Sequence, residues 1–158
     1  MSEDVQAVRV LALGQAHRGD DAFGLAVATR LERMGVALRL PQGDPLAVLD
    51  ALRGCRRAIV VDVLRVSQRA VGSIVRCDLL ALPIEQEGAV STHGNALGAA
   101  LRLGRELRCL PARIDLVGVV GGRFGLGEGL SPTVARAVPQ AAREVLGLSS
   151  RLDALAAP

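Results

Sequence analysis

The hydrophobic and polar positions of the chain form short apolar runs separated by amphipathic segments. Apolar or β-branched runs predict strands at residues 8–13, 36–40, 58–63 and 114–120. Residues 72–77 predict a further strand, which we place at an edge of the sheet. The run at residues 58–63 is the strongest, and Asp62 interrupts it near its end.

Helical spacing of apolar residues predicts helices between these strands. Phe23, Val27, Leu31 and Met34 recur on one helix face. The pair Asp44–Pro45 favours the start of a short helix that stops near Gly54. Another helix is expected from near His93 to about Leu107, after a loop-like stretch at residues 83–92. A last helix, capped by Ser131–Pro132, carries an apolar stripe made of Val134, Val138, Ala141, Val145 and Leu148.

Alternating strands and helices are typical of an α/β fold with a mainly parallel sheet. We expect one three-layer domain over residues 1–158, with about five strands in a twisted sheet and helices on both faces. A chain of 158 residues is long enough for one hydrophobic core and shows no internal repeat or linker. Residues 149–158 are expected to form a frayed tail.

Composition argues against several classes of function. Half of the residues are hydrophobic and 22% are charged, which excludes a disordered chain. With no Trp, no Tyr and two Phe, the chain lacks the stacking platforms of single-strand nucleic-acid binders. All 19 basic residues are arginines, and they are dispersed rather than clustered, so the net charge of +3 does not predict a nucleic-acid partner.

The three cysteines (Cys55, Cys77 and Cys109) are odd in number and form no CxxC motif, which favours a reducing compartment. The polar N-terminal residues resemble no signal peptide, and no apolar run reaches about 18 residues. We therefore expect a cytoplasmic monomer without membrane association.

Three polar residues are candidates for chemistry. In an open α/β sheet, ligands bind beyond the carboxyl ends of the strands, where Asp21, Asp62 and His93 are all expected. Two carboxylates and one imidazole suit a divalent first-row metal. Each residue also has a plain structural interpretation: Asp21 can stabilise a helix start, Asp62 can cap a loop, and His93 can begin a helix.

The first loop does not predict a dinucleotide site. Its glycines, Gly14, Gly19 and Gly24, do not follow the GxGxxG spacing. Asp20, which we interpret as a helix cap, and Asp21 would also repel a phosphate at this helix start. No GxSxG or HExxH motif is present, so a serine-elbow hydrolase and a standard zinc protease are not indicated.

Taken together, four blocks of sequence resemble the nickel–iron hydrogenase maturation proteases. The first, residues 14–24, reads GQAHRGDDAFG and is similar to the family's N-terminal signature. The others are the apolar strand that ends in Val61–Asp62, Ser91–Thr92–His93, and the glycine-rich segment 118–134. The likeness spans residues 8–146 and is strongest to members that serve cytoplasmic bidirectional, NAD-linked hydrogenases.

This resemblance implies an aspartyl-type endopeptidase that removes a C-terminal extension from the hydrogenase large-subunit precursor after nickel insertion. The family's metal-binding and catalytic positions fall on Asp21, Asp62 and His93. The nickel would be presented by the substrate, and other divalent ions could occupy the site in vitro. The sequence departs from the signature at four positions: Gln15, Ala16, His17 and Ala22. In some members an Asp after the second strand is a proposed catalytic group, and here the nearest Asp in that stretch, Asp44, is displaced by a few residues.

Two alternatives remain at this stage. A non-catalytic relative could sense metal and bind the large subunit without cutting it. An unrelated small α/β hydrolase, acting on a nucleotide or on peptidyl-tRNA, would instead bind phosphate in the pocket.

Overall fold

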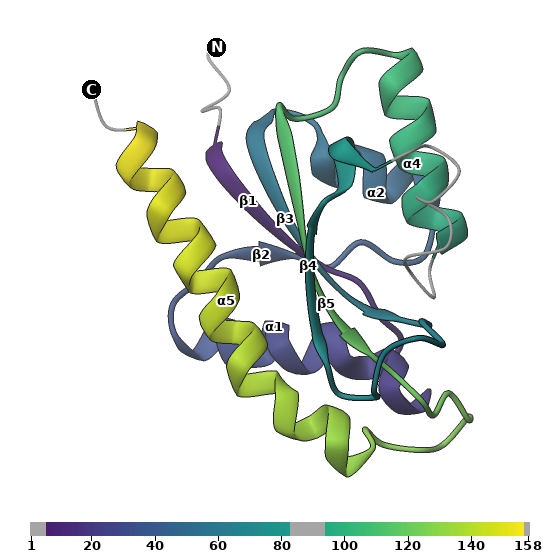
Figure 1. Ribbon diagram of the computed structural model, residues 1–158. Helices are drawn as coiled ribbons and strands as arrows, with labels where there is room; N and C mark the ends of the chain where they lie inside the picture. The colour runs from purple at the N-terminus through teal and green to yellow at the C-terminus, as the bar shows by residue number, and fades with distance from the viewer. Residues whose placement is uncertain (1–5, 83–93, 157–158) are drawn as a thin grey trace.

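The structure is a computed structural model that describes residues 6–82 and 94–156 (Figure 1). The elements follow in this order: β1 (Gln6–Ala12), η1 (Gly19–Ala22), α1 (Phe23–Arg33), β2 (Leu38–Arg39), α2 (Pro45–Leu52), β3 (Cys55–Leu64), β4 (Ile74–Asp78), η2 (Leu79–Ala81), α4 (Gly94–Glu106), β5 (Arg113–Val120) and α5 (Pro132–Ala156). The predicted loop at residues 83–92 and the predicted ligand His93 lie outside the described residues.

The strands form one sheet in the order β2–β1–β3–β5–β4. β1 pairs in parallel with β2 and β3, and β3 pairs in parallel with β5, whereas β4 runs antiparallel along β5. The prediction of an α/β fold with a mostly parallel, five-stranded sheet is confirmed, including the edge position of β4. β3 lies at the centre, which explains its long apolar run, since both of its faces are covered.

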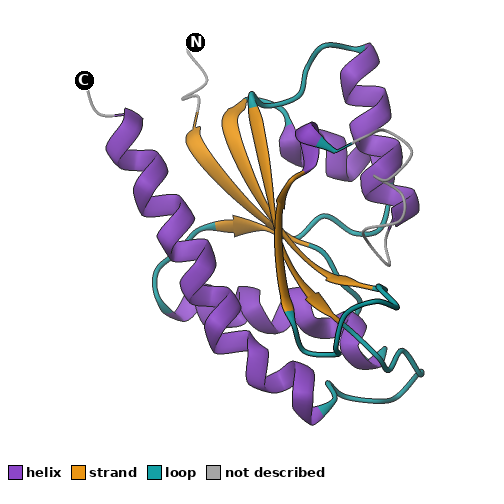
Figure 2. Cartoon of the chain, in the orientation of Figure 1, coloured by secondary structure: helices purple, strands orange, loops and turns teal. Residues whose placement is uncertain are grey.

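Two hydrophobic cores lie on the two faces of this sheet, and helices cover both faces (Figure 2). α1 and α5 pack on one face and contact each other, while α2 and α4 pack together on the other. Side chains of β3 alternate between the two cores: Ile59, Val61 and Val63 face α1 and α5, and Val60 and Leu64 face α2 and α4.

A local signal in the sequence accounts for the start of α2, whereas the ends of α1 and α5 differ from the prediction. The Asp44 carboxylate accepts a hydrogen bond from the backbone N–H of Leu46 at 3.1 Å, so the predicted cap of α2 is confirmed. α1 ends at Arg33, and Met34 is 55% exposed, so placing Met34 on the buried face was wrong. α5 continues to Ala156, so the helix is longer than the sequence indicated; fraying of its end stays a prediction.

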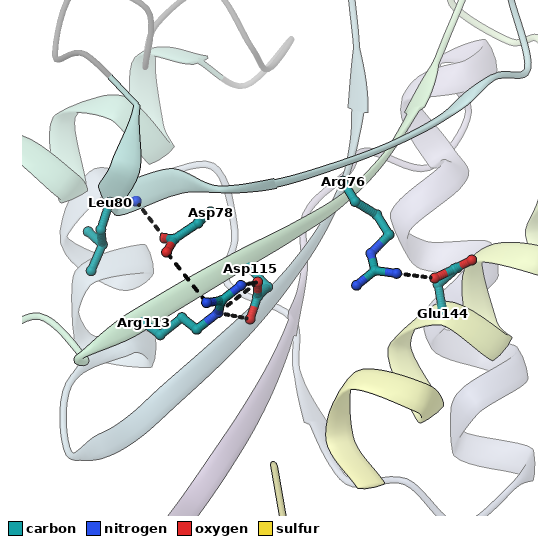
Figure 3. Close-up of polar contacts among 6 residues, drawn as sticks. All are labelled: Arg76, Asp78, Leu80, Arg113, Asp115 and Glu144. Atoms are coloured by element: carbon teal, nitrogen blue, oxygen red, sulfur yellow. Dashed lines mark hydrogen bonds and ion pairs between the residues drawn. The ribbon is translucent and has the colours of Figure 1, made fainter. Parts of the chain in front are cut away.

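Hydrogen bonds and ion pairs connect the antiparallel edge strand β4 to β5 and α5 (Figure 3). The Arg113 guanidinium donates hydrogen bonds to both oxygens of Asp115, at 2.8–3.0 Å, and lies 3.8 Å from the Asp78 carboxylate. Arg76 on β4 pairs with Glu144 on α5 at 2.8 Å. These ion pairs are partly exposed to solvent and link β4 to β5 and α5.

Candidate functional site at the carboxyl edge of the sheet

Three connecting segments meet where the parallel strands β1, β3 and β5 end. Residues 13–22 follow β1 and include η1, residues 65–73 link β3 to β4, and residues 121–131 link β5 to α5. In Figure 1 the second and third segments run side by side at the lower right. This is the edge at which open α/β sheets bind their ligands.

Asp62 lies within β3, two residues before its end, and is fully buried. Strand alternation directs its side chain toward the layer of α2 and α4, between Val60 and Leu64. One carboxylate oxygen accepts a hydrogen bond from the backbone N–H of Val63 at 2.8 Å. A buried carboxylate in an otherwise apolar strand carries a desolvation cost, which favours a role in chemistry over a role in packing.

Asp21 lies in η1 and is also buried, with 6% of its surface exposed. η1 contacts β3, so Asp21 and Asp62 lie at the same edge of the sheet. The close approach depends on Gly24, because a Cβ there would overlap the Leu13 carbonyl oxygen and lie 3.1 Å from the Val61 carbonyl oxygen. Glycine therefore lets the start of α1 rest directly on the ends of β1 and β3.

The third predicted ligand, His93, lies outside the described residues, immediately before α4 begins at Gly94. Within residues 6–82 and 94–156, no group of three or more His, Cys, Asp or Glu side chains is placed to hold a metal ion. The structure thus brings two of the three residues to one edge, and the complete set of Asp21, Asp62 and His93 stays a prediction.

Asp20 has a different role from the one that its position suggested. Neither η1 nor α1 has a side-chain cap, so the interpretation of Asp20 as a helix cap is wrong. Its carboxylate instead accepts hydrogen bonds from the backbone N–H groups of Gly122, Arg123 and Ser131, at 2.8–2.9 Å. Asp20 therefore holds the glycine-rich segment in place, through partners more than 100 residues away in the chain.

The environment of Asp20 favours its charged form. Burial alone would raise the pKa of this carboxyl group, but the backbone N–H groups of Gly122, Ser131 and Arg123 outweigh burial and lower the pKa below the usual value of 3.8. The nearby Ser131 hydroxyl acts in the same direction. The charged carboxylate of Asp20 therefore directly precedes Asp21 in the chain.

The segment after β1 and the segment after β5 are also joined along their backbones. The Gly19 N–H donates to the Glu128 carbonyl at 2.9 Å, and the Gly127 N–H donates to the His17 carbonyl at 2.7 Å. Gly19 adopts φ +61°, and a Cβ there would overlap the Arg123 carbonyl oxygen. The glycine-rich composition of both segments is therefore explained by close packing of backbone on backbone.

His17 is exposed and adopts φ 61°, a conformation that is uncommon for a residue with a side chain. Its carbonyl is engaged by Gly127, so its backbone fixes the loop while its imidazole remains on the surface. The structural interpretation of His17 as a loop residue is confirmed. A contact between its imidazole and a substrate stays a prediction.

Comparisons with known proteins agree with this fold. Residues 43–148 match a family model described as hydrogenase maturation protease, HycI. The structure is similar to the hydrogenase maturating endopeptidase HybD from Escherichia coli, with a TM-score of 0.79, 22% identity, and coverage of 92% of this chain and 93% of that one. A nickel–iron hydrogenase maturation protease HybD from Thermococcus kodakarensis gives a TM-score of 0.71 and 24% identity, with 90% and 99% of the two chains covered.

A third structure, the maturation protease HycI from Thermococcus kodakarensis KOD1, gives a TM-score of 0.64 and 24% identity over 91% of this chain and 92% of that one. The sequence matches none of the curated proteins. No helix among the described residues is long and apolar enough to cross a membrane.

Proposed function

This chain belongs to the hydrogenase maturation protease family, and from that premise we propose that it cleaves a C-terminal extension from a hydrogenase large-subunit precursor that already holds nickel. The family match does not favour the alternative of an unrelated nucleotide or peptidyl-tRNA hydrolase. A bidirectional, NAD-linked hydrogenase as the partner and a cytoplasmic location remain predictions from the sequence.

The observation that carries the proposal is the placement of two buried carboxylates, Asp21 and Asp62, at the carboxyl edge of the sheet. Carboxylate oxygens and an imidazole nitrogen are ligands that divalent first-row metals accept, so the donor set fits a nickel ion. We infer that Asp21, Asp62 and His93 contact the nickel that the precursor presents. A precursor without nickel would lack this contact and would bind less tightly.

The chain's own residues prepare this edge for a cation. Burial lowers the local dielectric constant, which strengthens the attraction between the two carboxylates and a positive ion. The Val63 N–H group fixes one oxygen of Asp62, which orients the carboxylate without neutralising its charge. A metal ion bound there supplies a Lewis acid that can polarise a peptide carbonyl or lower the pKa of a water molecule.

The test is a processing assay with the large-subunit precursor, prepared with and without nickel, and followed by the shift in its mobility on a gel. We expect wild type to shorten only the nickel-loaded precursor. Asp21→Asn, Asp62→Asn and His93→Ala should each reduce the rate about a hundredfold, because His93→Ala removes a ligand and each Asn replaces a carboxylate with a neutral, weaker oxygen ligand.

The matched control is Asp50→Asn, which removes an exposed carboxylate on α2 and should process at the wild-type rate. Binding of the precursor without any shortening would favour the non-catalytic alternative. Normal processing by His93→Ala or by both Asp variants would refute the proposed site.

A further inference from the structure

Exposed arginines lie on the three segments that form the carboxyl edge, the edge at which the buried carboxylates of the candidate site also lie. The three segments that form the carboxyl edge carry five exposed charged side chains: Arg18, Arg65, Arg69, Arg123 and Glu128. Four of these are positive and one is negative. We call this group of four arginines the arginine rim. Over the whole chain, acidic and basic residues number 16 and 19.

The loops that carry the arginine rim are fixed to one another, so the charges have a defined arrangement. Arg18 lies in the segment that is joined along its backbone to Glu128. The segment after β3 is held by the hydrogen bond from the Gly72 N–H to the Val120 carbonyl at 2.8 Å, and Val71 lies directly against Gly122.

Arg65 contacts an aromatic ring of the glycine-rich segment. Its guanidinium carbon lies 3.9 Å from the centre of the Phe124 ring, a cation–π contact between the segment after β3 and the glycine-rich segment. Phe124 in turn packs against the core formed by α1 and α5. A guanidinium stacked in this way keeps its N–H groups directed outward in its own plane, where they can bind a carboxylate with two hydrogen bonds.

The charges of the arginine rim are largely uncompensated within the described part of the chain. Arg123 lies 3.7 Å from the Glu128 carboxylate. Arg18 donates a hydrogen bond to the neutral Gln15 side chain. Among the described residues, no carboxylate lies within ion-pair distance of Arg18, Arg65 or Arg69. Leu126, which is 77% exposed, adds an apolar side chain in the same glycine-rich segment.

From this arrangement we propose that the arginine rim docks an acidic segment of the substrate protein, with Arg65 as the positioning residue that binds one of its carboxylates. The inference rests on the proposed function for the identity of the substrate. The proposal assigns different roles to the two groups at the carboxyl edge. The buried carboxylates bind the metal ion, and the exposed arginines bind the surface of the substrate protein near that ion. Charges placed at the margin of an interface act mainly on association and on its salt dependence.

The experiment measures processing of the nickel-loaded large-subunit precursor by Arg65→Glu and by the control Arg56→Glu. Arg56 is exposed near the beginning of β3, and Arg65 follows the end of the same strand, so the two lie about 30 Å apart at opposite edges of the sheet. We expect Arg65→Glu to raise KM about tenfold with kcat within about twofold of wild type, and Arg56→Glu to change neither.

Two further variants separate docking from a loss of folding. Arg65→Lys keeps the charge but loses the planar guanidinium, and Phe124→Leu keeps Arg65 but removes its support. Both should raise KM by a smaller factor than Arg65→Glu does. Raising the salt concentration from 50 to 200 mM should raise KM for wild type and have a weaker effect on Arg65→Glu.

Direct binding of the precursor, measured by calorimetry, provides a readout that does not require cleavage. If wild type binds but does not cut, the proposed function fails while the docking proposal is still judged by the affinity of Arg65→Glu. Equal KM and equal affinity for Arg65→Glu and Arg56→Glu, or a wild-type KM that does not depend on salt, would overturn the docking proposal.

Discussion

Adjacent aspartates in this protein have different surroundings, although the sequence offers little to distinguish them. Asp20 is buried against three backbone N–H groups of the segment that follows β5, whereas Asp21 lies where η1 meets β3. A local interpretation of the sequence assigned Asp20 to helix capping, because the true partners lie 102–111 residues away. Only the glycine-rich composition of residues 121–129 hinted that the backbone there is closely approached.

Replacing Asp20 with Asn should lower the free energy of unfolding by about 3 kcal/mol. Asn keeps the shape, but it loses the charge that strengthens three hydrogen bonds and turns an NH₂ group toward backbone donors. Urea denaturation followed by circular dichroism measures this change. Asp50→Asn, an exposed control, should stay within about 0.5 kcal/mol of wild type.

The lowered pKa of Asp20 also makes the stability of the folded protein depend on pH. Because the pKa of Asp20 is lower in the folded state than the usual 3.8, its contribution is complete above pH 3.8 and is lost as pH falls through the folded pKa. Wild type should therefore lose more stability than Asp20→Asn does between pH 5 and pH 2. Parallel stability curves for the two proteins would contradict this account.

At the level of elements, hydrophobic periodicity predicts the order and type of the helices and strands, because each element buries one or both of its faces. Boundaries are less well predicted where no local signal marks them. α1 ends one residue before Met34, and α5 continues beyond Ser149, because helix ends depend on packing that a single sequence does not display. The close approach of α1 to the sheet requires glycine at position 24.

Gly24→Ala should destabilise the protein by about 2–4 kcal/mol, since the added methyl group meets the Leu13 carbonyl and pushes α1 away from the sheet. Gly147 on α5 is the matched control, because a Cβ there meets nothing within 4 Å. Gly147→Ala should stabilise α5 by about 0.5–1 kcal/mol, since Ala favours helix more than Gly does. Thermal unfolding of the two variants should shift in opposite directions.

For the molecule as a whole, the sequence predicts the architecture but only part of the site. Parallel topology explains why residues as distant as Asp21 and Asp62 reach one edge. The packing of the three connecting segments could not be predicted, because it depends on backbone-to-backbone contacts that leave no periodic pattern. The arginine rim could not be predicted for a related reason, because its members are dispersed in the sequence and lie on segments that come together only in the fold.

Both cores share the central strand, so the protein should unfold as one cooperative unit. Leu31 on α1 and Leu101 on α4 are fully buried, one in each core. Leu31→Ala and Leu101→Ala should each lower the stability by about 2–5 kcal/mol and shift a single transition. Calorimetry tests this expectation, and two separate transitions in either variant would show that the cores unfold independently.

The anchoring of Asp20 by Ser131 has a consequence for biosynthesis. A ribosome makes the chain from its N-terminus, so the first block of the site is synthesised long before the segment that secures it. Until residues 122–131 have left the exit tunnel, the emerging polypeptide lacks the full set of backbone N–H groups that hold that carboxylate. The first block of the site therefore reaches its final arrangement only after the segment that follows β5 has been synthesised.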